Sequence, residues 1–95
     1  MRRVQKYSTT VAMTSANTQY AFTITKDMQN ITLQLDSAAV AWWYSWTTGQ
    51  VAGGTGTDVG AGFGVKQTNA VANTSIYFAS GSASQTMNIT YEIPS

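Results

Sequence analysis

The chain has 95 residues, enough for a single domain built around one core. Charged residues make up 9% of it and the formal net charge is +1, which argues against a general nucleic-acid-binding protein. Cysteine and histidine are absent, so disulfides, zinc–thiolate sites and the usual Ser/His/Asp and Cys/His catalytic arrangements are excluded. The polar character comes mainly from threonine, serine, asparagine and glutamine, a mixture that favours strands joined by turns.

The first residues contain no apolar run as long as that of a signal peptide. No stretch approaches the about 20 apolar residues of a membrane span either. We therefore expect a protein that is made in a cytoplasm and has no membrane partner.

Residues 1–13 are predicted to form an amino-terminal arm and a first strand, and residues 14–95 the main β-domain. Within the strand, near 7–13, Val11 and Met13 are expected to pack inward. Arg2 and Arg3, with Lys6 nearby, form a basic cluster that suits an acidic partner. Terminal charges are more often solvated, so both interpretations stay open.

Two segments alternate apolar and polar residues with the period of two that is typical of strands. They are 19–25 and 29–35, joined by a short polar turn at 26–28. Two such runs with a short turn predict a β-hairpin. The residues expected to face the core are Tyr20, Phe22, Ile24, Ile31, Leu33 and Leu35.

All three tryptophans lie close together in a strand predicted over 40–46. Alternation places Val40, Trp42, Tyr44 and Trp46 on one face, whose apolar bulk indicates the centre of the core. Trp43 is expected to point the other way.

The glycine-rich segment 47–62 is predicted to be a long exposed loop. It lacks the Gly-Lys-Ser/Thr ending of a phosphate-binding loop and the spacing of a dinucleotide fingerprint. Its Asp58 supplies too few oxygen ligands for calcium. We therefore expect no cofactor and no metal here.

Three further strands are expected in the last third of the chain. One starts at Phe63 and Val65, one covers 74–79, and the last covers 86–93. The residues expected to face inward from the last two are Ile76, Phe78, Met87, Ile89, Tyr91 and Ile93. Nothing shows the 3.6-residue period of a helix, so about seven short strands predict an all-β antiparallel sandwich or small barrel.

Only four acidic side chains are present: Asp27, Asp36, Asp58 and Glu92. Asp27 and Asp36 flank one strand at opposite ends, which is too far apart for a glycosidase pair. A pair that includes Asp58 stays open, but acids at turns usually cap the backbone. We predict that the protein is not an enzyme and has no catalytic residues.

Trp43 and Tyr77 are the aromatic residues expected to face away from the core. Such side chains can stack on a sugar, and they are also enriched at protein interfaces. The sequence leaves both alternatives open, with packing or assembly favoured.

The carboxyl-terminal half resembles small all-β virion proteins of tailed bacteriophages. The similarity covers the strand Ile76-Tyr77-Phe78, the turn Ser82-Ala83-Ser84-Gln85 and the alternating strand Met87-x-Ile89-x-Tyr91. It implies a jelly-roll-like sandwich of seven to eight strands that serves as a capsid decoration (cement) protein. Such proteins commonly form trimers at capsid symmetry points.

The resulting hypothesis is a structural protein on the capsid exterior. Its expected partners are the major capsid protein and copies of itself in a homotrimer, with no nucleic acid and no membrane. The interface candidates are Arg2, Arg3, Trp43 and Tyr77. The alternative is a carbohydrate- or receptor-binding module of a tail or head fibre, with a glycan as its partner.

Overall fold

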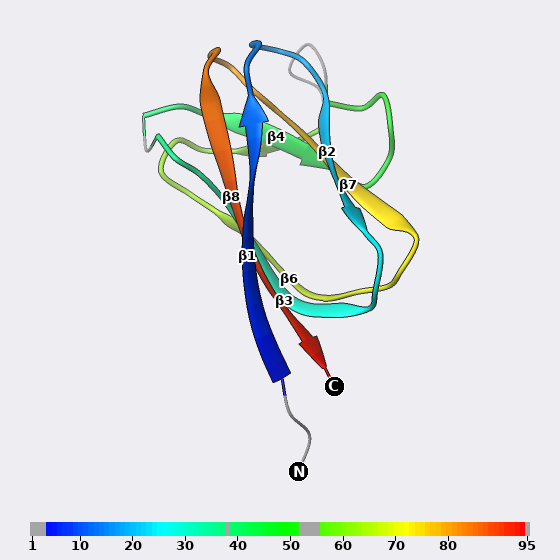
Figure 1. The fold of residues 1–95 in the computed structure, drawn as a ribbon. Coiled ribbons are helices and arrows are strands. Elements are labelled where there is room, and N and C mark those ends of the chain that lie inside the picture. Colours follow the sequence, from blue (N-terminus) through cyan, green and yellow to red (C-terminus); the bar gives the residue numbers. More distant parts are fainter. Residues whose placement is uncertain (1–3, 38, 52–55, 95) are drawn as a thin grey trace.

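The computed structural model describes residues 4–37, 39–51 and 56–94 of the chain. Within this part the chain forms eight strands, shown in Figure 1: β1 Val4–Met13, β2 Tyr20–Ile24, β3 Met28–Leu35, β4 Trp42–Ser45, β5 Thr57–Val59, β6 Val65–Ala70, β7 Thr74–Ser80 and β8 Gln85–Pro94. Every pairing between them is antiparallel. Among these residues, no helix has the length and apolar character needed to cross a membrane.

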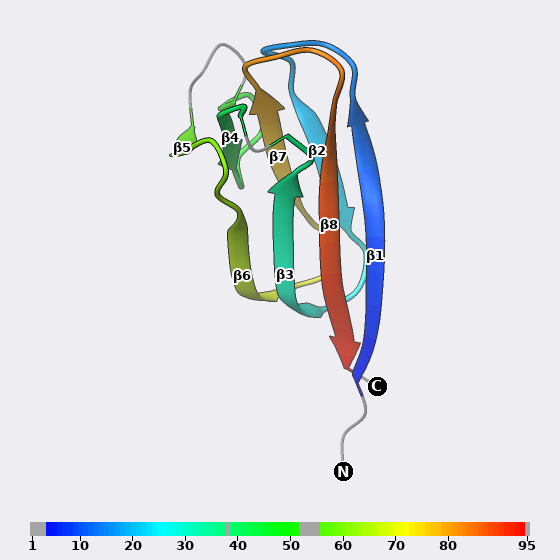
Figure 2. The same ribbon diagram turned by 90° about the vertical axis from the view of Figure 1, so that its left-hand side faces the viewer.

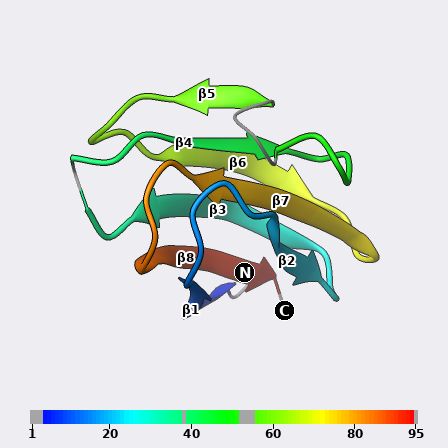
Figure 3. The same cartoon turned by 90° about the horizontal axis from the view of Figure 1, so that it is seen from above.

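The strands build two four-stranded sheets that pack face to face. Their orders are β1-β8-β3-β6 and β2-β7-β4-β5, and Figures 2 and 3 show the two layers. Apart from the step from β4 to β5, each connection carries the chain from one sheet to the other. This arrangement is a jelly roll. The prediction of a single antiparallel, jelly-roll-like β-sandwich with seven to eight strands is therefore confirmed.

The predicted hairpin of 19–25 with 29–35 is wrong. β2 pairs with β7, whereas β3 pairs with β8 and β6 in the other sheet. The polar turn carries the chain across the sandwich, so the inward side chains of β2 and β3 meet across the core. Alternation shows which face of a strand is buried, but it does not show which strand lies beside it.

The core lies between the sheets and contains the predicted inward residues of several strands. Its buried members are Met13, Ile24, Met28, Ile31, Leu33, Leu35, Trp42, Val59, Ala70, Ile76, Phe78, Met87 and Ile89. Tyr20, Phe22, Val40, Tyr44 and Tyr91 are partly buried against them. Trp42 is the largest fully buried side chain, and its indole Nε1 donates a hydrogen bond to the carbonyl oxygen of Phe63 at 3.3 Å.

The strand around the tryptophans is shorter than predicted. β4 ends at Ser45, so alternation no longer applies to Trp46, which is 39% exposed and does not face the core. Trp46 instead lines a groove of about 350 Å³ beside β6, together with the exposed Val71. The core-facing assignment of Trp46 was wrong because the strand ends one residue before it.

The segment 47–62 is only in part an exposed loop. Thr57–Val59 forms the short strand β5, which pairs with β4 and brings Val59 into the core. Val51 is fully buried. Four of the loop's residues, 52–55, lie outside the described part. Phe63 is 69% exposed and precedes β6, which begins at Val65.

β1 and β8 form the longest ladder of the sandwich. Their register runs without a shift from Val4 opposite Pro94 to Met13 opposite Gln85. In Figure 2 this pair extends past the other strands at the end of the molecule where the chain begins and ends. β1 thus lies at the outer side of its sheet, exposed from Gln5 to Ser8 and buried at Met13.

Candidate interaction surfaces

The free side of β1 is the first surface with functional potential. β1 is the outermost strand of its sheet and, among the described strands, pairs only with β8. Lys6 is its one charged residue, and the side chains from Gln5 to Ser8 are exposed. An outermost strand presents unpaired backbone N–H and C=O groups, which can pair with a strand of another chain.

A run of three aromatic rings leads from the core to this edge. Tyr91 lies 5.6 Å from Phe22, centroid to centroid, and Tyr7 stacks on Tyr91 at 5.5 Å. Phe22 and Tyr91 pack against the core, whereas Tyr7 is 41% exposed. The edge of β1 therefore carries an aromatic side chain that is held in place by the interior.

The predicted basic cluster can be placed only in part. Arg2 and Arg3 lie outside the described residues, so their role as interface residues stays a prediction. Lys6 lies on β1, opposite Glu92 of β8.

Trp43 and Tyr77 lie on the same outer face of the second sheet. In the β4–β7 ladder Trp43 pairs with Ala79 and Ser45 pairs with Tyr77, so the two aromatic residues are diagonal neighbours. Diagonal neighbours lie about 7–8 Å apart, within reach of long side chains. Both are half-buried, and the Trp43 ring lies beside Gly81 in the turn after β7. Because Gly81 and Tyr77 lie on opposite sides of Ala79 along the chain, the Trp43 ring leans away from Tyr77.

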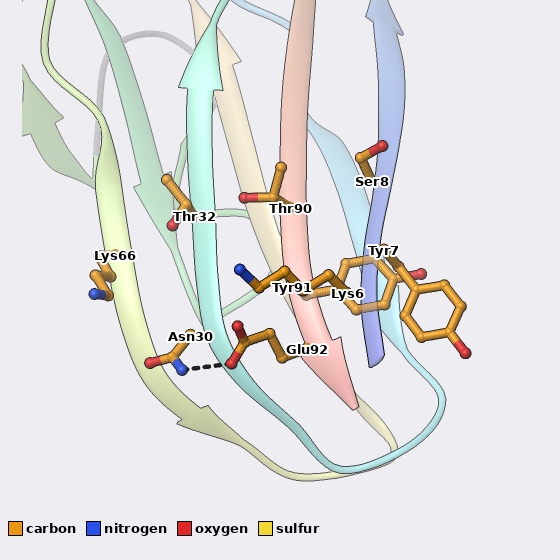
Figure 4. A pocket seen from close by; sticks show the side chains of 9 residues that line it. All are labelled: Lys6, Tyr7, Ser8, Asn30, Thr32, Lys66, Thr90, Tyr91 and Glu92. Carbon is orange, nitrogen blue, oxygen red and sulfur yellow. Dashed lines mark hydrogen bonds between the residues drawn. The ribbon is translucent and has the colours of Figure 1, made fainter. Parts of the chain in front are cut away.

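A third surface is a depression of about 500 Å³ in the outer face of the first sheet, drawn in Figure 4. It is lined by Lys6, Tyr7, Ser8, Asn30, Thr32, Lys66, Thr90, Tyr91 and Glu92. The strand register places Ser8, Thr90, Thr32 and Lys66 side by side in one row across all four strands. The floor is therefore a row of hydroxyl groups that ends at a lysine.

Two amide side chains hold the carboxylate of Glu92 at the side of this depression. Asn30 Nδ2 donates to Glu92 Oε1 at 2.7 Å, and Gln29 Nε2 donates to the same oxygen at 3.4 Å. The bond from Asn30, followed by that from Gln29 and by attraction to Lys6 and Lys66, lowers the pKa of Glu92. The β3–β8 register shifts between Gln29 and Thr32, and this irregularity places both amides beside the carboxylate.

The two lysines of the depression attract Glu92 but make no direct contact with it. Neither Lys6 nor Lys66 makes a hydrogen bond or an ion pair among the described residues. They come from the two outermost strands of the sheet, and Figure 4 shows the Lys6 side chain reaching from β1 across β8. The depression thus offers two ammonium groups and several hydroxyls to a ligand.

Sequence reasoning missed this depression. Alternation places Thr32 and Thr90 on the outward faces of the predicted strands 29–35 and 86–93, but it does not relate them to each other or to Lys66. The signal was the outward alternation of polar residues on several strands. Without the order β1-β8-β3-β6 it could not be combined into one surface.

Two of the acidic residues have the structural role expected from their positions. Asp27 Oδ1 accepts a hydrogen bond from the Ala72 N–H at 2.8 Å, and Asp36 Oδ1 accepts one from the Thr86 N–H at 3.1 Å. Asp58 lies in β5 rather than in a turn, opposite Trp43. In the described residues, no group of three or more acidic, histidine or cysteine side chains is arranged to hold a metal ion.

Comparisons of the chain with protein-family models, curated proteins and solved structures found no match. The similarity of the carboxyl-terminal half to phage virion proteins therefore stays a hypothesis.

Proposed function

We propose that the protein is a non-enzymatic virion structural protein, a capsid decoration (cement) protein that bridges neighbouring capsid subunits. It works by adhesion, through contacts with the major capsid protein and with copies of itself in a trimer. The observation that carries the proposal is the free edge of β1, with Tyr7 exposed at the end of the aromatic run.

Soluble proteins usually protect such an edge with several charges, a proline, a bulge or a covering segment. β1 has ten residues with one lysine, and its register with β8 has no shift. An edge of this kind suits a permanent neighbour whose strand continues the sheet. Because the chain carries few charges, we expect attachment to depend only weakly on salt.

The size of the protein also fits adhesion. Its accessible surface is 5415 Å², so a standard contact of about 800 Å² per partner covers about one seventh of it. A few such contacts leave little of the surface free. Jelly rolls occur in viral capsid proteins and also in lectins, so the fold supports the proposal only by analogy.

The test is the mass of the purified protein by light scattering at several concentrations, followed by binding to empty capsids. We expect a trimer in solution and retention on capsids. Tyr7→Lys puts a charge at the edge of β1 and should weaken both. Phe63→Lys, which removes an exposed aromatic side chain outside β1, should weaken neither. A monomer that fails to bind capsids would refute the proposal.

A second candidate is a carbohydrate- or receptor-binding module, favoured by the diagonal placement of Trp43 and Tyr77. Two half-buried rings on the same outer sheet face can each stack on a unit of a sugar chain. Under this alternative, Trp43→Ala abolishes glycan binding on an array and leaves the oligomer intact. Under the assembly proposal, the same substitution weakens the oligomer or its attachment.

A further inference from the structure

We propose that the depression on the outer face of the β1-β8-β3-β6 sheet binds a carboxylated sugar, such as a uronic acid residue of an acidic polysaccharide. This site lies on the opposite sheet from Trp43 and Tyr77. It is also distinct from the backbone edge of β1, because strand pairing extends a sheet sideways and leaves its outer face open. The inference therefore does not depend on the proposed function.

The dimensions of the depression suit a short saccharide. Its volume of about 500 Å³ lies within the range of small-molecule sites. β1 and β6 are three strand spacings apart, which amounts to about 14 Å at ~4.8 Å per spacing. A ligand that spans this width can reach both Lys66 and the inward-reaching Lys6 while it lies over Thr32 and Thr90.

The lysines indicate a negatively charged ligand. Among the described residues, Lys6 and Lys66 make no hydrogen bond or ion pair, and the one carboxylate near them, Glu92, balances only one of their two charges, so the depression keeps a net positive charge for an anion. The hydroxyl groups of Thr32 and Thr90 lie on the two strands between them, Ser8 lies on the same strand as Lys6, and all three can donate to or accept from a polar ligand. A neutral sugar would leave two ammonium groups with the single carboxylate of Glu92 as counter-charge.

Glu92 indicates a ligand that also carries hydroxyl groups. Asn30 and Gln29 both donate to Oε1 of Glu92, and no described residue donates to its Oε2. A fixed carboxylate with one unused oxygen is an acceptor for ligand hydroxyls. The same negative charge disfavours phosphate-rich ligands. A uronic acid carries one carboxylate, which suits the lysines, and several hydroxyls, which suit the unused oxygen of Glu92.

The experiment is a titration of the full chain with a short oligogalacturonate, followed by NMR of the backbone amides. The matched control ligand is the fully methyl-esterified oligomer, which has the same shape without the charge. We expect the acidic oligomer to bind with a millimolar dissociation constant and to shift amides around Thr32, Lys66 and Thr90. The ester should bind at least about threefold more weakly, because exposed charge contacts are individually modest.

Matched variants test the residues. Lys66→Gln and Lys6→Gln should each weaken binding about threefold or more, since each removes one ammonium group. Thr90→Val should weaken it by removing a floor hydroxyl. Lys26→Gln is the control, because Lys26 is exposed in the turn between β2 and β3 and does not line the depression. The amide spectrum of each variant shows whether it is folded.

Several results would overturn the inference. One is the absence of binding, and another is equal affinity for acid and ester. A loss of affinity in Lys26→Gln as large as in Lys66→Gln would show nonspecific charge attraction. If Trp43→Ala lost binding while the two lysine variants kept it, the sugar would be bound on the other sheet. Because none of these readouts depends on oligomer mass or capsid binding, failure here leaves the decoration proposal intact.

Discussion

The ring of Tyr7 stacks on the ring of Tyr91, with centroids 5.5 Å apart and planes inclined by 16°. The two residues are opposite each other in the β1–β8 ladder. Because Tyr91 also packs against Phe22, the exposed ring of Tyr7 is connected to the core through a single intermediate ring. The ring of Tyr7 therefore stabilises the sandwich by stacking, and it also leaves an exposed surface at the edge of β1 for a partner to contact.

Replacing Tyr7 should show how much its stacking contributes to stability. We expect Tyr7→Ala to lower the free energy of unfolding by about 0.5–1.5 kcal/mol, the usual contribution of an aromatic pair. Urea unfolding measures this change at protein concentrations too low for the chains to associate. Phe63→Ala, at a more exposed ring, should change it by no more than about 0.5 kcal/mol. Equal effects of the two substitutions would mean that the Tyr7 stack does not stabilise the fold.

The three tryptophans should differ strongly in their contribution to stability. Trp42 is fully buried and its indole N–H is bonded to the carbonyl of Phe63, so Trp42→Ala should cost about 3–5 kcal/mol. That is a large part of the total stability of a small domain. Trp46→Ala should cost less than about 1 kcal/mol, because Trp46 is partly exposed. Chemical unfolding of both variants, followed by circular dichroism, makes the comparison. Similar losses would contradict the observed burial.

Glu92 should give the stability of the protein a component that depends on pH. Its pKa is lowered in the folded state, first by the Asn30 bond and then by Gln29 and the two lysines. A folded pKa below the unfolded one stabilises the fold above the unfolded pKa, about 4.3, and this contribution is lost as the pH falls through the folded pKa. The stability difference between the protein and Glu92→Gln should therefore be present at neutral pH and shrink below about pH 4.

An NMR titration of the Glu92 carboxyl tests the cause of this shift. Asn30→Gly removes the main donor, and glycine tolerates the positive φ of 52° at this position. The pKa of Glu92 should then rise toward its ordinary value. The control is Asn73→Gly, at another asparagine with positive φ (69°), in the turn between β6 and β7. If both variants left the pKa of Glu92 unchanged, the amide of Asn30 would not be its cause.

The buried faces of most strands could be predicted, because alternation is a local property of the chain. Ile31 and Leu33 in β3 and Ile76 and Phe78 in β7 all face the core as expected. Strand neighbours could not be predicted in the same way. Whether β2 pairs with β3 or with β7 depends on which connections cross the sandwich, and a turn of three polar residues is compatible with either.

The candidate sites depend on sheet order even more strongly. Trp43 and Tyr77 were each expected to point outward, but only the β4–β7 register makes them neighbours. Lys6 and Lys66 are 60 positions apart in the sequence and line one depression only because β1 and β6 belong to the same sheet. The burial of Val51 could not be predicted from its neighbours either, because the residues around it are small and polar.

Gly56 allows a test of how tightly the chain packs after β4. Its φ is +90°, and a Cβ atom there would lie 2.9 Å from the Tyr44 carbonyl oxygen and 3.0 Å from that of Gln50. Backbone atoms cannot move aside as a flexible side chain can, so Gly56→Ala should add a steric cost to the cost of its positive φ. Gly49 is the matched control, because its φ is +81° but a Cβ would meet nothing within 4 Å.

We expect Gly49→Ala to lower the free energy of unfolding by about 1 kcal/mol, the cost of a positive φ for alanine. Gly56→Ala should lower it by at least about 2 kcal/mol, since backbone strain and overpacking each contribute 1–3 kcal/mol. Urea unfolding of both variants gives the difference between them, which isolates the clash from the conformational cost. Equal losses would show that the backbone at Tyr44 and Gln50 can give way to a methyl group, and that the turn holding Val51 is loosely packed.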